Sequence, residues 1–337
     1  MKIRCALLLA ALIGAVFAAA PTQAQTPPPA RQPAAKSPAK PQTAAPAPSA
    51  PDPDADADAD QAYGAFQRGY YLTAFALATQ RAEKGDAKAM TLLGELHANG
   101  LGVPRDDAKA ANWYKLAVDR GDREAMFALA LFRLAGRAGP RDREESARLL
   151  SSAAKLGHAA AAYNLGLLYL EGQQFPQDFG RAAELFRVAA RAGTPEAQYA
   201  LATLLKDGRG VPKDLREAVR LLAAAALADH TDAQVEYAIA LFNGEGVDKN
   251  EAAAADLLRK AARKGSPIAQ NRLARVFATG RGLPGDPAQA TKWHIIAKSR
   301  GATDLWLDEF VAKLSPEVRA AGEQAAKPWL TTRPPHS

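Results

Sequence analysis

The chain has 337 residues, a formal net charge of +7 and a hydrophobic content of 48%, with aromatic residues at 7% of positions. This composition supports a packed core that is rich in alanine and leucine. Acidic and basic residues are interleaved without a block of Lys and Arg, so we interpret them as solvated helix faces and exclude a nucleic-acid-binding stripe.

Residues 1–24 have the pattern of a secretory signal peptide. Two basic residues precede an apolar run that begins at Cys5, and small residues allow cleavage after Ala24. The run is short for a membrane span, and nothing later in the sequence reaches that length. We therefore expect a periplasmic protein whose mature chain begins near Gln25, without cysteine, disulfide or membrane insertion.

Residues 25–60 form a segment rich in proline and alanine, which is typical of an extended, disordered linker. Acidic residues alternate over 52–60, a spacing that resembles part of a calcium-binding loop. The glycine and the closing glutamate of such a loop are missing, so we favour a solvated acidic run that leads into a helix N-terminus.

Residues 61–84 are predicted to form a partial first repeat, and six full repeats of 36 residues follow over 85–301. An alanine and a glycine mark the period without slippage, at Ala89, Ala125, Ala161, Ala197, Ala233 and Ala269 and at Gly100, Gly136, Gly172, Gly208, Gly244 and Gly280. A fixed period of this length indicates a solenoid, in which each repeat buries its apolar face against its neighbours.

Each repeat is predicted to hold a first helix (helix A), a glycine-rich turn and a second helix (helix B). In the fourth repeat helix A is expected from about Pro195 to Lys206, and helix B ends near Leu227. Polar residues before the helices predict N-caps at Asp86, Asp122, Thr194, Ser266 and Thr303 for helix A, and at Asp106, Asp142, Asp178, Asp214, Asn250 and Asp286 for helix B. Capping boxes are expected with Glu145, Glu217 and Gln289.

Two columns of residues predict how the paired helices pack. A position in helix A is always small, at Gly94, Ala130, Gly166, Ala202, Ala238 and Ala274. A larger apolar residue in helix B is expected to fill the space beside it, at Trp113, Leu149, Leu185, Leu221, Leu257 and Trp293. Glycine inside a helix costs roughly 1 kcal/mol relative to alanine, so its recurrence indicates a packing requirement.

These residues carry a resemblance to a known family. The pattern Ala-x-x-x-Leu-Gly-x-x-Tyr-x-x-Gly, best seen in 161–172, resembles the Sel1-like repeat, a relative of the tetratricopeptide repeat. The resemblance covers about three quarters of the chain and implies an all-α, right-handed α/α solenoid that acts as a protein-interaction scaffold. Residues 302–330 are then expected to form two capping helices, and residues 331–337 a tail.

Few motifs in the sequence suggest chemistry. The Gly-x-Gly-Val turns follow helices rather than strands, so we interpret them as inter-helix turns. Ser152 and Lys155 match the Ser-x-x-Lys of serine β-lactamase-type enzymes, but the accompanying Ser-Asp-Asn and Lys-Thr-Gly elements are missing. The histidines have no helical spacing suited to a metal, with His158 and His230 in inter-repeat turns. We expect no cofactor, no metal site and no enzyme activity.

The candidate binding residues follow from the resemblance, because helix A lines the concave face of the related tetratricopeptide architecture. Its groove positions in repeats two to five hold Phe127, Leu131 and Leu134; Tyr163, Leu167 and Leu170; Tyr199, Thr203 and Lys206; and Val235, Ile239 and Phe242. The end repeats are more polar there, with Thr91 and Glu95 at one end and Asn271 and Arg275 at the other. Such a strip suits an amphipathic helix or an extended peptide, with Tyr163 and Tyr199 as anchors. The alternative is that curvature buries the strip as core.

The sequence therefore favours a non-enzymatic periplasmic scaffold that binds a protein or peptide, with a role in envelope regulation suggested by related exported proteins. The alternative from another functional class is a hydrolase that acts on the cell wall or on β-lactams, built on Ser152 and Lys155. These alternatives are distinguished by whether a nucleophile, a base and an orienting group converge.

Overall fold

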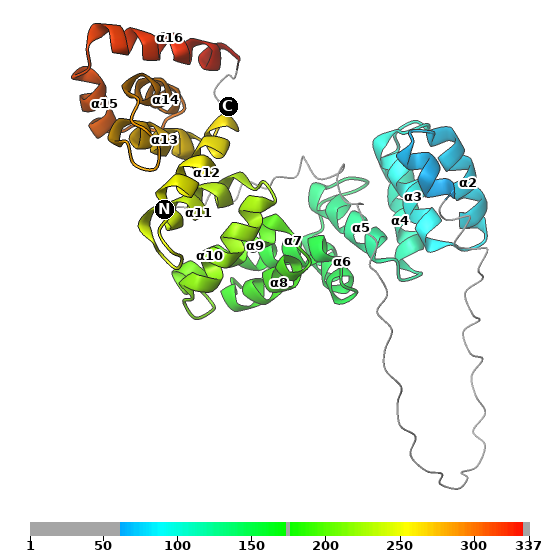
Figure 1. The fold of residues 1–337 in the computed structure, drawn as a ribbon. Coiled ribbons are helices and arrows are strands. Elements are labelled where there is room, and N and C mark those ends of the chain that lie inside the picture. Colours follow the sequence, from blue (N-terminus) through cyan, green and yellow to red (C-terminus); the bar gives the residue numbers. More distant parts are fainter. Residues whose placement is uncertain (1–60, 173–175, 333–337) are drawn as a thin grey trace, which may run out of the picture. The chain divides into compact units, whose positions relative to one another are not determined.

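The computed structural model describes residues 61–172 and 176–332, and within these ranges the regular structure is helical throughout (Figure 1). The predicted signal peptide and linker lie outside the described residues. Residues 61–67 are helical and precede α2 (Tyr71–Glu83). The predicted all-α repeat architecture is confirmed.

Six pairs of antiparallel helices follow α2 in the order predicted. The A helices are α3 (Ala87–Asn99), α5 (Arg123–Ala135), α7 (Ala159–Glu171), α9 (Pro195–Asp207), α11 (Thr231–Asn243) and α13 (Pro267–Thr279). The B helices are α4 (Asp107–Val118), α6 (Arg143–Lys155), α8 (Phe179–Arg191), α10 (Leu215–Leu227), α12 (Glu251–Arg263) and α14 (Pro287–Ser299). The chain ends with α15 (Leu305–Ala312) and α16 (Pro316–Thr332).

The chain forms two compact units that divide after Arg120. The first contains α2 to α4, and the second contains α5 to α16. The candidate residues of repeats two to five all lie in the second unit, so they can be considered within one body.

Most of the predicted N-caps are confirmed. The aspartate or asparagine before each helix B accepts a hydrogen bond from a backbone N–H in the first turn, as Asp214 does from Glu217 at 2.9 Å. Thr194 begins α9 without a side-chain cap bond. The prediction for Thr303 is wrong, because α15 starts later and Asp304 caps it through the N–H of Leu307.

The capping boxes are only half formed. The N–H of Asp214 donates to the carbonyl of Leu205 at 3.0 Å, and the carboxylate of Glu217 pairs with Arg220 at 2.7 Å. The tight turn thus brings the cap residue Asp214 close to the end of helix A. Its backbone N–H is therefore already hydrogen-bonded to a carbonyl of that helix. Asp142 donates to Arg133 in the same way. A reciprocal bond from the third residue is therefore not needed.

The small column of helix A makes room for a ring or a leucine from helix B. A Cβ on Gly166 would lie 2.6 Å from Cε1 of Phe186, and one on Gly94 would lie 2.5 Å from Cε1 of Tyr114. The deepest helix B column is therefore one residue later than predicted, because that position faces the small residue. Its members are buried in every repeat: Tyr114, Leu150, Phe186, Leu222, Leu258 and His294. Of the predicted column, Trp113, Leu149, Leu185 and Leu257 are only partly buried.

The second glycine of the turn allows consecutive repeats to stack. Gly210 has φ +68°, and a Cβ there would lie 2.3 Å from the carbonyl carbon of Phe179, at the start of the preceding helix B. A side chain would therefore push the repeats apart. Gly102 approaches Tyr71 of α2 in the same manner. In the second repeat this position is Ala138, which has φ 57°.

Buried glutamines add a second connection between repeats four to six. Gln270 is fully buried and donates from Nε2 to the carbonyl of Ala262 at 3.0 Å. Gln234 makes the equivalent bond to Ala226 at 3.2 Å. Each bond joins a side chain of one helix A to a carbonyl near the end of the preceding helix B, which also accepts a backbone N–H of the turn. The stacking of repeats is thus polar as well as apolar.

Candidate binding face of the A helices

The residues of the predicted strip are mostly half-buried, so the strip is neither fully exposed nor fully part of the core. Its members are partly exposed except for Val235, which is 4% exposed and belongs to the core beside α12. We therefore remove Val235 from the candidates. The remaining residues are called the A-helix face: Phe127, Leu131, Leu134, Tyr163, Leu167, Leu170, Tyr199, Thr203, Lys206, Ile239 and Phe242.

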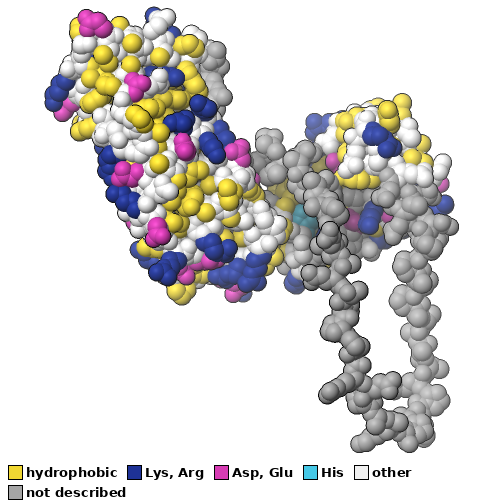
Figure 2. Space-filling view, in the orientation of Figure 1, with side chains coloured by type: hydrophobic (Ala, Val, Ile, Leu, Met, Phe, Trp, Pro, Cys, Tyr) yellow, Lys and Arg dark blue, Asp and Glu magenta, His cyan; other side chains and the backbone are white. Residues whose placement is uncertain are grey.

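The structure brings together only part of this face on one core cluster. Tyr163, Leu167, Leu170 and Tyr199, from α7 and α9, all pack against the same buried cluster. Phe127 and Leu134 pack against a neighbouring cluster, and Ile239 and Phe242 against a third. In the view of Figure 2, hydrophobic side chains of the second unit lie among acidic and basic ones. The central segment of the face is thus α7 with α9.

Two histidines that the sequence left in turns are N-caps of A helices. His158 Nδ1 accepts a hydrogen bond from the N–H of Ala161 at 3.1 Å, and His230 Nδ1 accepts from Ala233 at 3.2 Å. Both residues have the extended backbone of a cap position. Their alignment with the Asp, Thr and Ser caps of other repeats was the signal that could have identified them.

Each of these histidines also stacks on an aromatic residue of the face. The rings of Phe127 and His158 have centroids 4.4 Å apart, and those of Tyr199 and His230 are 4.9 Å apart. The aromatic residue belongs to one helix A and the histidine to the start of the next. These contacts fix the spacing of neighbouring A helices along the face.

Carboxylates lie around this stacked row. Glu124 Oε2 is 2.9 Å from His158 Nε2, and this hydrogen bond is the main cause that lowers the pKa of Glu124. Burial, and after it the charges of Asp232 and Glu236, raise the pKa of Tyr199 to about 12. The phenol of Tyr199 is therefore neutral at physiological pH and keeps a proton that it can donate.

A salt bridge crosses the face at the other end of α9. Lys206 Nζ lies 2.7 Å from Glu236 Oε2 of α11, and both side chains are partly exposed. A pair this exposed contributes little stability, about 0–1 kcal/mol. It places a polar pair on the face about two turns along α9 from Tyr199.

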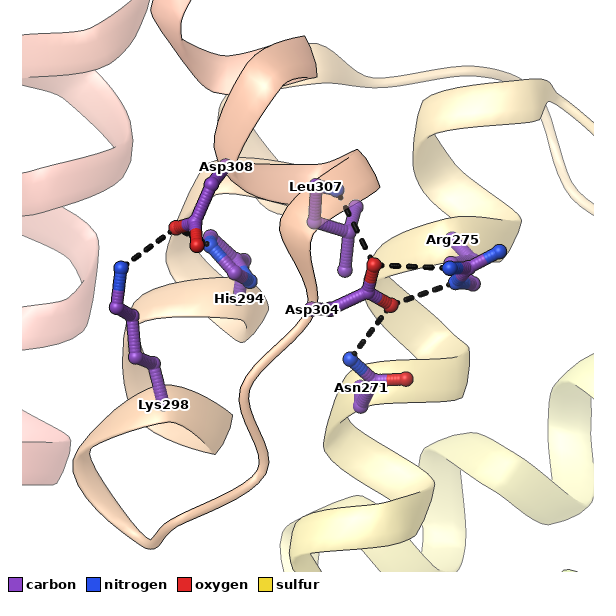
Figure 3. Close-up of polar contacts among 7 residues, drawn as sticks. All are labelled: Asn271, Arg275, His294, Lys298, Asp304, Leu307 and Asp308. Atoms are coloured by element: carbon purple, nitrogen blue, oxygen red, sulfur yellow. Dashed lines mark hydrogen bonds and ion pairs between the residues drawn. The ribbon is translucent and has the colours of Figure 1, made fainter.

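The polar residues predicted at the C-terminal end of the strip are engaged in a junction with α15 (Figure 3). Asp304 accepts two hydrogen bonds from Arg275, at 2.7 and 2.8 Å, and one from Asn271 at 3.0 Å. The hydrogen bonds from Arg275 are the largest cause that lowers the pKa of Asp304 to about 2. Arg275 also lies over the ring of Trp306. This end is thus used to hold the terminal helices.

A second carboxylate of α15 reinforces the junction. Asp308 lies 2.8 Å from His294 Nε2 and 2.6 Å from Lys298 Nζ, both on α14 (Figure 3). Trp329 of α16 also contacts α14, where its ring centroid lies 5.0 Å from that of Trp293. The last repeat is covered by this pair of helices.

The structure offers little support for the enzymatic alternative. Ser152 and Lys155 are exposed on α6. Within the described ranges, no three His, Cys, Asp or Glu residues are grouped as a metal would require. None of the helices in this part of the chain is long and apolar enough to cross a bilayer.

Comparison with known proteins places these features in a family. The Sel1 repeat model matches six consecutive segments, over residues 87–122, 123–158, 159–194, 195–230, 231–266 and 267–301. A Sel1 repeat protein from Oxalobacter formigenes has a similar structure, with TM-score 0.62 and 24% identity over 73% of this chain and 99% of that chain. No curated protein matches the sequence.

A second similar structure has the same fold. It is c5321, a protective antigen present in uropathogenic Escherichia coli strains that displays an SLR fold. Its TM-score is 0.56 and its identity 27%, over 77% of this chain and 64% of that chain. The described helices of this chain thus repeat an architecture that is known from solved structures.

Proposed function

The chain belongs to the Sel1 repeat family, and on that premise we propose that it is a non-enzymatic scaffold that binds a protein or peptide on its A-helix face. The observation that carries this proposal is the partly exposed apolar segment formed by Tyr163, Leu167, Leu170 and Tyr199. Aromatic residues with one apolar face and one polar tip dominate the energetics of protein interfaces.

The occupant that fits this segment is an amphipathic helix or an extended peptide. Apolar side chains spaced by three and four residues lie on one side of α7, and α9 continues the row with Tyr199. Polar groups of α11 and its N-cap border this row beside α9: Glu236 is paired with Lys206, and His230 is stacked on Tyr199. A partner with an apolar stripe and polar flanks would match both features.

The proposed setting is the periplasm, in a role in envelope regulation. This part of the proposal depends on the sequence of residues 1–24, whose basic start, apolar run and small residues are typical of an export signal. A binding module without its own chemistry suits a role in which another protein is held or masked. The Ser152 and Lys155 alternative gains no support from their exposed positions on α6.

Site-specific cross-linking tests the proposal. A photoreactive amino acid is placed at Leu167 on the A-helix face, and as a control at Val188, which is 46% exposed on helix B. After irradiation in cells we expect one discrete protein adduct from position 167 and none of that mass from position 188. Equal labelling from both positions, or adducts from position 188 alone, would show that the partner binds elsewhere.

A further inference from the structure

His230 is an unusual N-cap because its cap bond depends on its protonation state. The N–H of Ala233 donates to Nδ1 of His230 at 3.2 Å, so Nδ1 must carry a lone pair and the ring proton must lie on Nε2. A proton on Nδ1 would turn the acceptor into a donor that faces another donor. An aspartate or serine cap keeps its acceptor near neutral pH, whereas histidine changes charge there.

The surroundings of His230 contain charges of both signs. Glu196 and Tyr199 face it from α9, Asp232 from α11, and Lys264 from the end of α12. Lys264 also donates to the carbonyl of the adjacent residue, Asp229, at 2.7 Å. Among the residues that the structure describes, no carboxylate is hydrogen-bonded to this ring. Burial is the largest influence and lowers the pKa of His230. The charges of Asp232 and Glu196 act in the opposite direction, and that of Lys264 acts in the same direction as burial.

We propose that His230 is a proton-sensitive N-cap, which holds the start of α11 and its contact with Tyr199 only while Nδ1 is unprotonated. Protonation removes the cap bond to Ala233 and adds a positive charge at the helix N-terminus, where the macrodipole disfavours it. Mild acid therefore loosens the junction between the fourth and fifth repeats. The inference stands on the cap geometry and does not depend on what the A-helix face binds.

His158 provides an internal comparison. It has the same cap bond, to Ala161, and the same position relative to an aromatic ring. Its Nε2, however, lies 2.9 Å from the carboxylate of Glu124. The neutral ring at this position therefore has a hydrogen-bond partner on both of its nitrogens. The two sites thus share a backbone role and differ in whether a carboxylate is hydrogen-bonded to Nε2.

The direction of the pH effect follows from the sign of the shift. The pKa of His230 is lower in the folded protein than its ordinary value of 6.5, so the unfolded chain binds more protons. The stability associated with a neutral His230 is complete above about pH 6.5 and decreases as the pH falls toward the folded value. If His230 stays neutral in the folded protein, lowering the pH from 7.5 to 5.5 raises the unfolding equilibrium constant by at most about tenfold.

The test compares the full chain with His230→Asn and His158→Asn by urea unfolding at pH 7.5 and 5.5. Asparagine is a suitable replacement because Asn250 caps α12 in this protein. We expect the unfolding constant of the wild type to rise up to about tenfold more than that of His230→Asn on acidification. His158→Asn makes the same replacement at the other histidine cap and serves as the matched comparison. Should His230→Asn fail to fold, His230→Ser replaces it, with Ser266 as the precedent.

A second measurement tests whether protonation of His230 also breaks its cap bond to Ala233. Nitrogen-15 NMR at pH 7.5 should show the His230 tautomer with its proton on Nε2, and the Ala233 amide should shift with the ring as the pH falls. Equal acid responses in the wild type and His230→Asn would overturn the proposal. So would an Ala233 amide that does not move while the ring titrates.

Discussion

The rings of Tyr199 and His230 stack with their centroids 4.9 Å apart and their planes 24° apart, although the two residues belong to neighbouring repeats. Phe127 and His158 show the same relationship two repeats earlier. A residue proposed to bind a partner is therefore also in contact with the N-cap of the next helix A. The A-helix face is held in shape by contacts between its own repeats.

The fit between Gly166 and Phe186 gives a prediction about the core. Gly166→Ala should destabilise the protein by about 1–3 kcal/mol, because the new Cβ would overlap a fully buried ring. Chemical denaturation of the wild type and the variant would measure this. An unchanged free energy of unfolding would show that the glycine is not required for packing.

The same column supplies the control. In other repeats alanine faces leucine, as at Ala202 and Leu222, which are both buried. Phe186→Leu combined with Gly166→Ala recreates that pair. We expect the double variant to be more stable than the sum of the two single effects predicts, with a coupling energy of about 1 kcal/mol or more.

The Asp304 junction gives a prediction about pH. The pKa of Asp304 is lowered from its ordinary value to about 2, so the junction is stabilised above about pH 4 and this contribution is lost as the pH falls toward 2. Because Arg275 is 42% exposed, solvent screening reduces the effect of Asp304→Asn to about 1 kcal/mol at pH 7. The difference between the wild type and this variant should decrease as the pH falls through about 2.

A matched control for this variant is Asp286→Asn. Asp286 caps α14 in the same way, through the N–H of Gln289, and asparagine is an equally good cap. We expect a change within about 0.5 kcal/mol, because this cap is not part of the Arg275 network. Equal losses in the two variants would assign the effect to capping and not to the ion pairs.

Much of the architecture could be predicted because the residues that begin and end each helix recur every 36 residues. The aspartates before each helix B and the glycines after each helix A follow local rules of capping, which sequence alone expresses. The partner of each small residue could not be predicted in the same way. Whether Gly166 faces Leu185 or Phe186 depends on the rotation of α8 about its axis, which is set by packing against the next repeat.

The candidate site was less predictable for the same reason. Val235 has the sequence position of Tyr163 and Tyr199, but it is buried beside α12, whereas both tyrosines are partly exposed. Asn271 and Arg275 were expected to form a more polar end of the strip, but they are hydrogen-bonded to Asp304, the residue that caps α15. Both differences arise from contacts between repeats, which the pattern within a repeat does not contain.

The export prediction concerns residues outside the described structure. Mass spectrometry of the native protein from its own host should find a mature chain that starts near Gln25 and has no lipid. The physical reason is the basic start, apolar run and small-residue site of residues 1–24. Recovery of an intact Met1 or an acylated Cys5 would contradict it.

The binding claim is tested most directly by the affinity for the partner recovered from cross-linking, measured by titration calorimetry with Tyr163→Ala, Tyr199→Ala and the control Val188→Ala. We predict that each tyrosine variant weakens binding by about 1–2 kcal/mol, or roughly 5- to 30-fold in Kd, while Val188→Ala binds as the wild type does. The tyrosine variants should remain folded at the temperature of the titration. Unchanged affinity in both tyrosine variants, or global unfolding of both, would contradict the claim and assign these rings to the core.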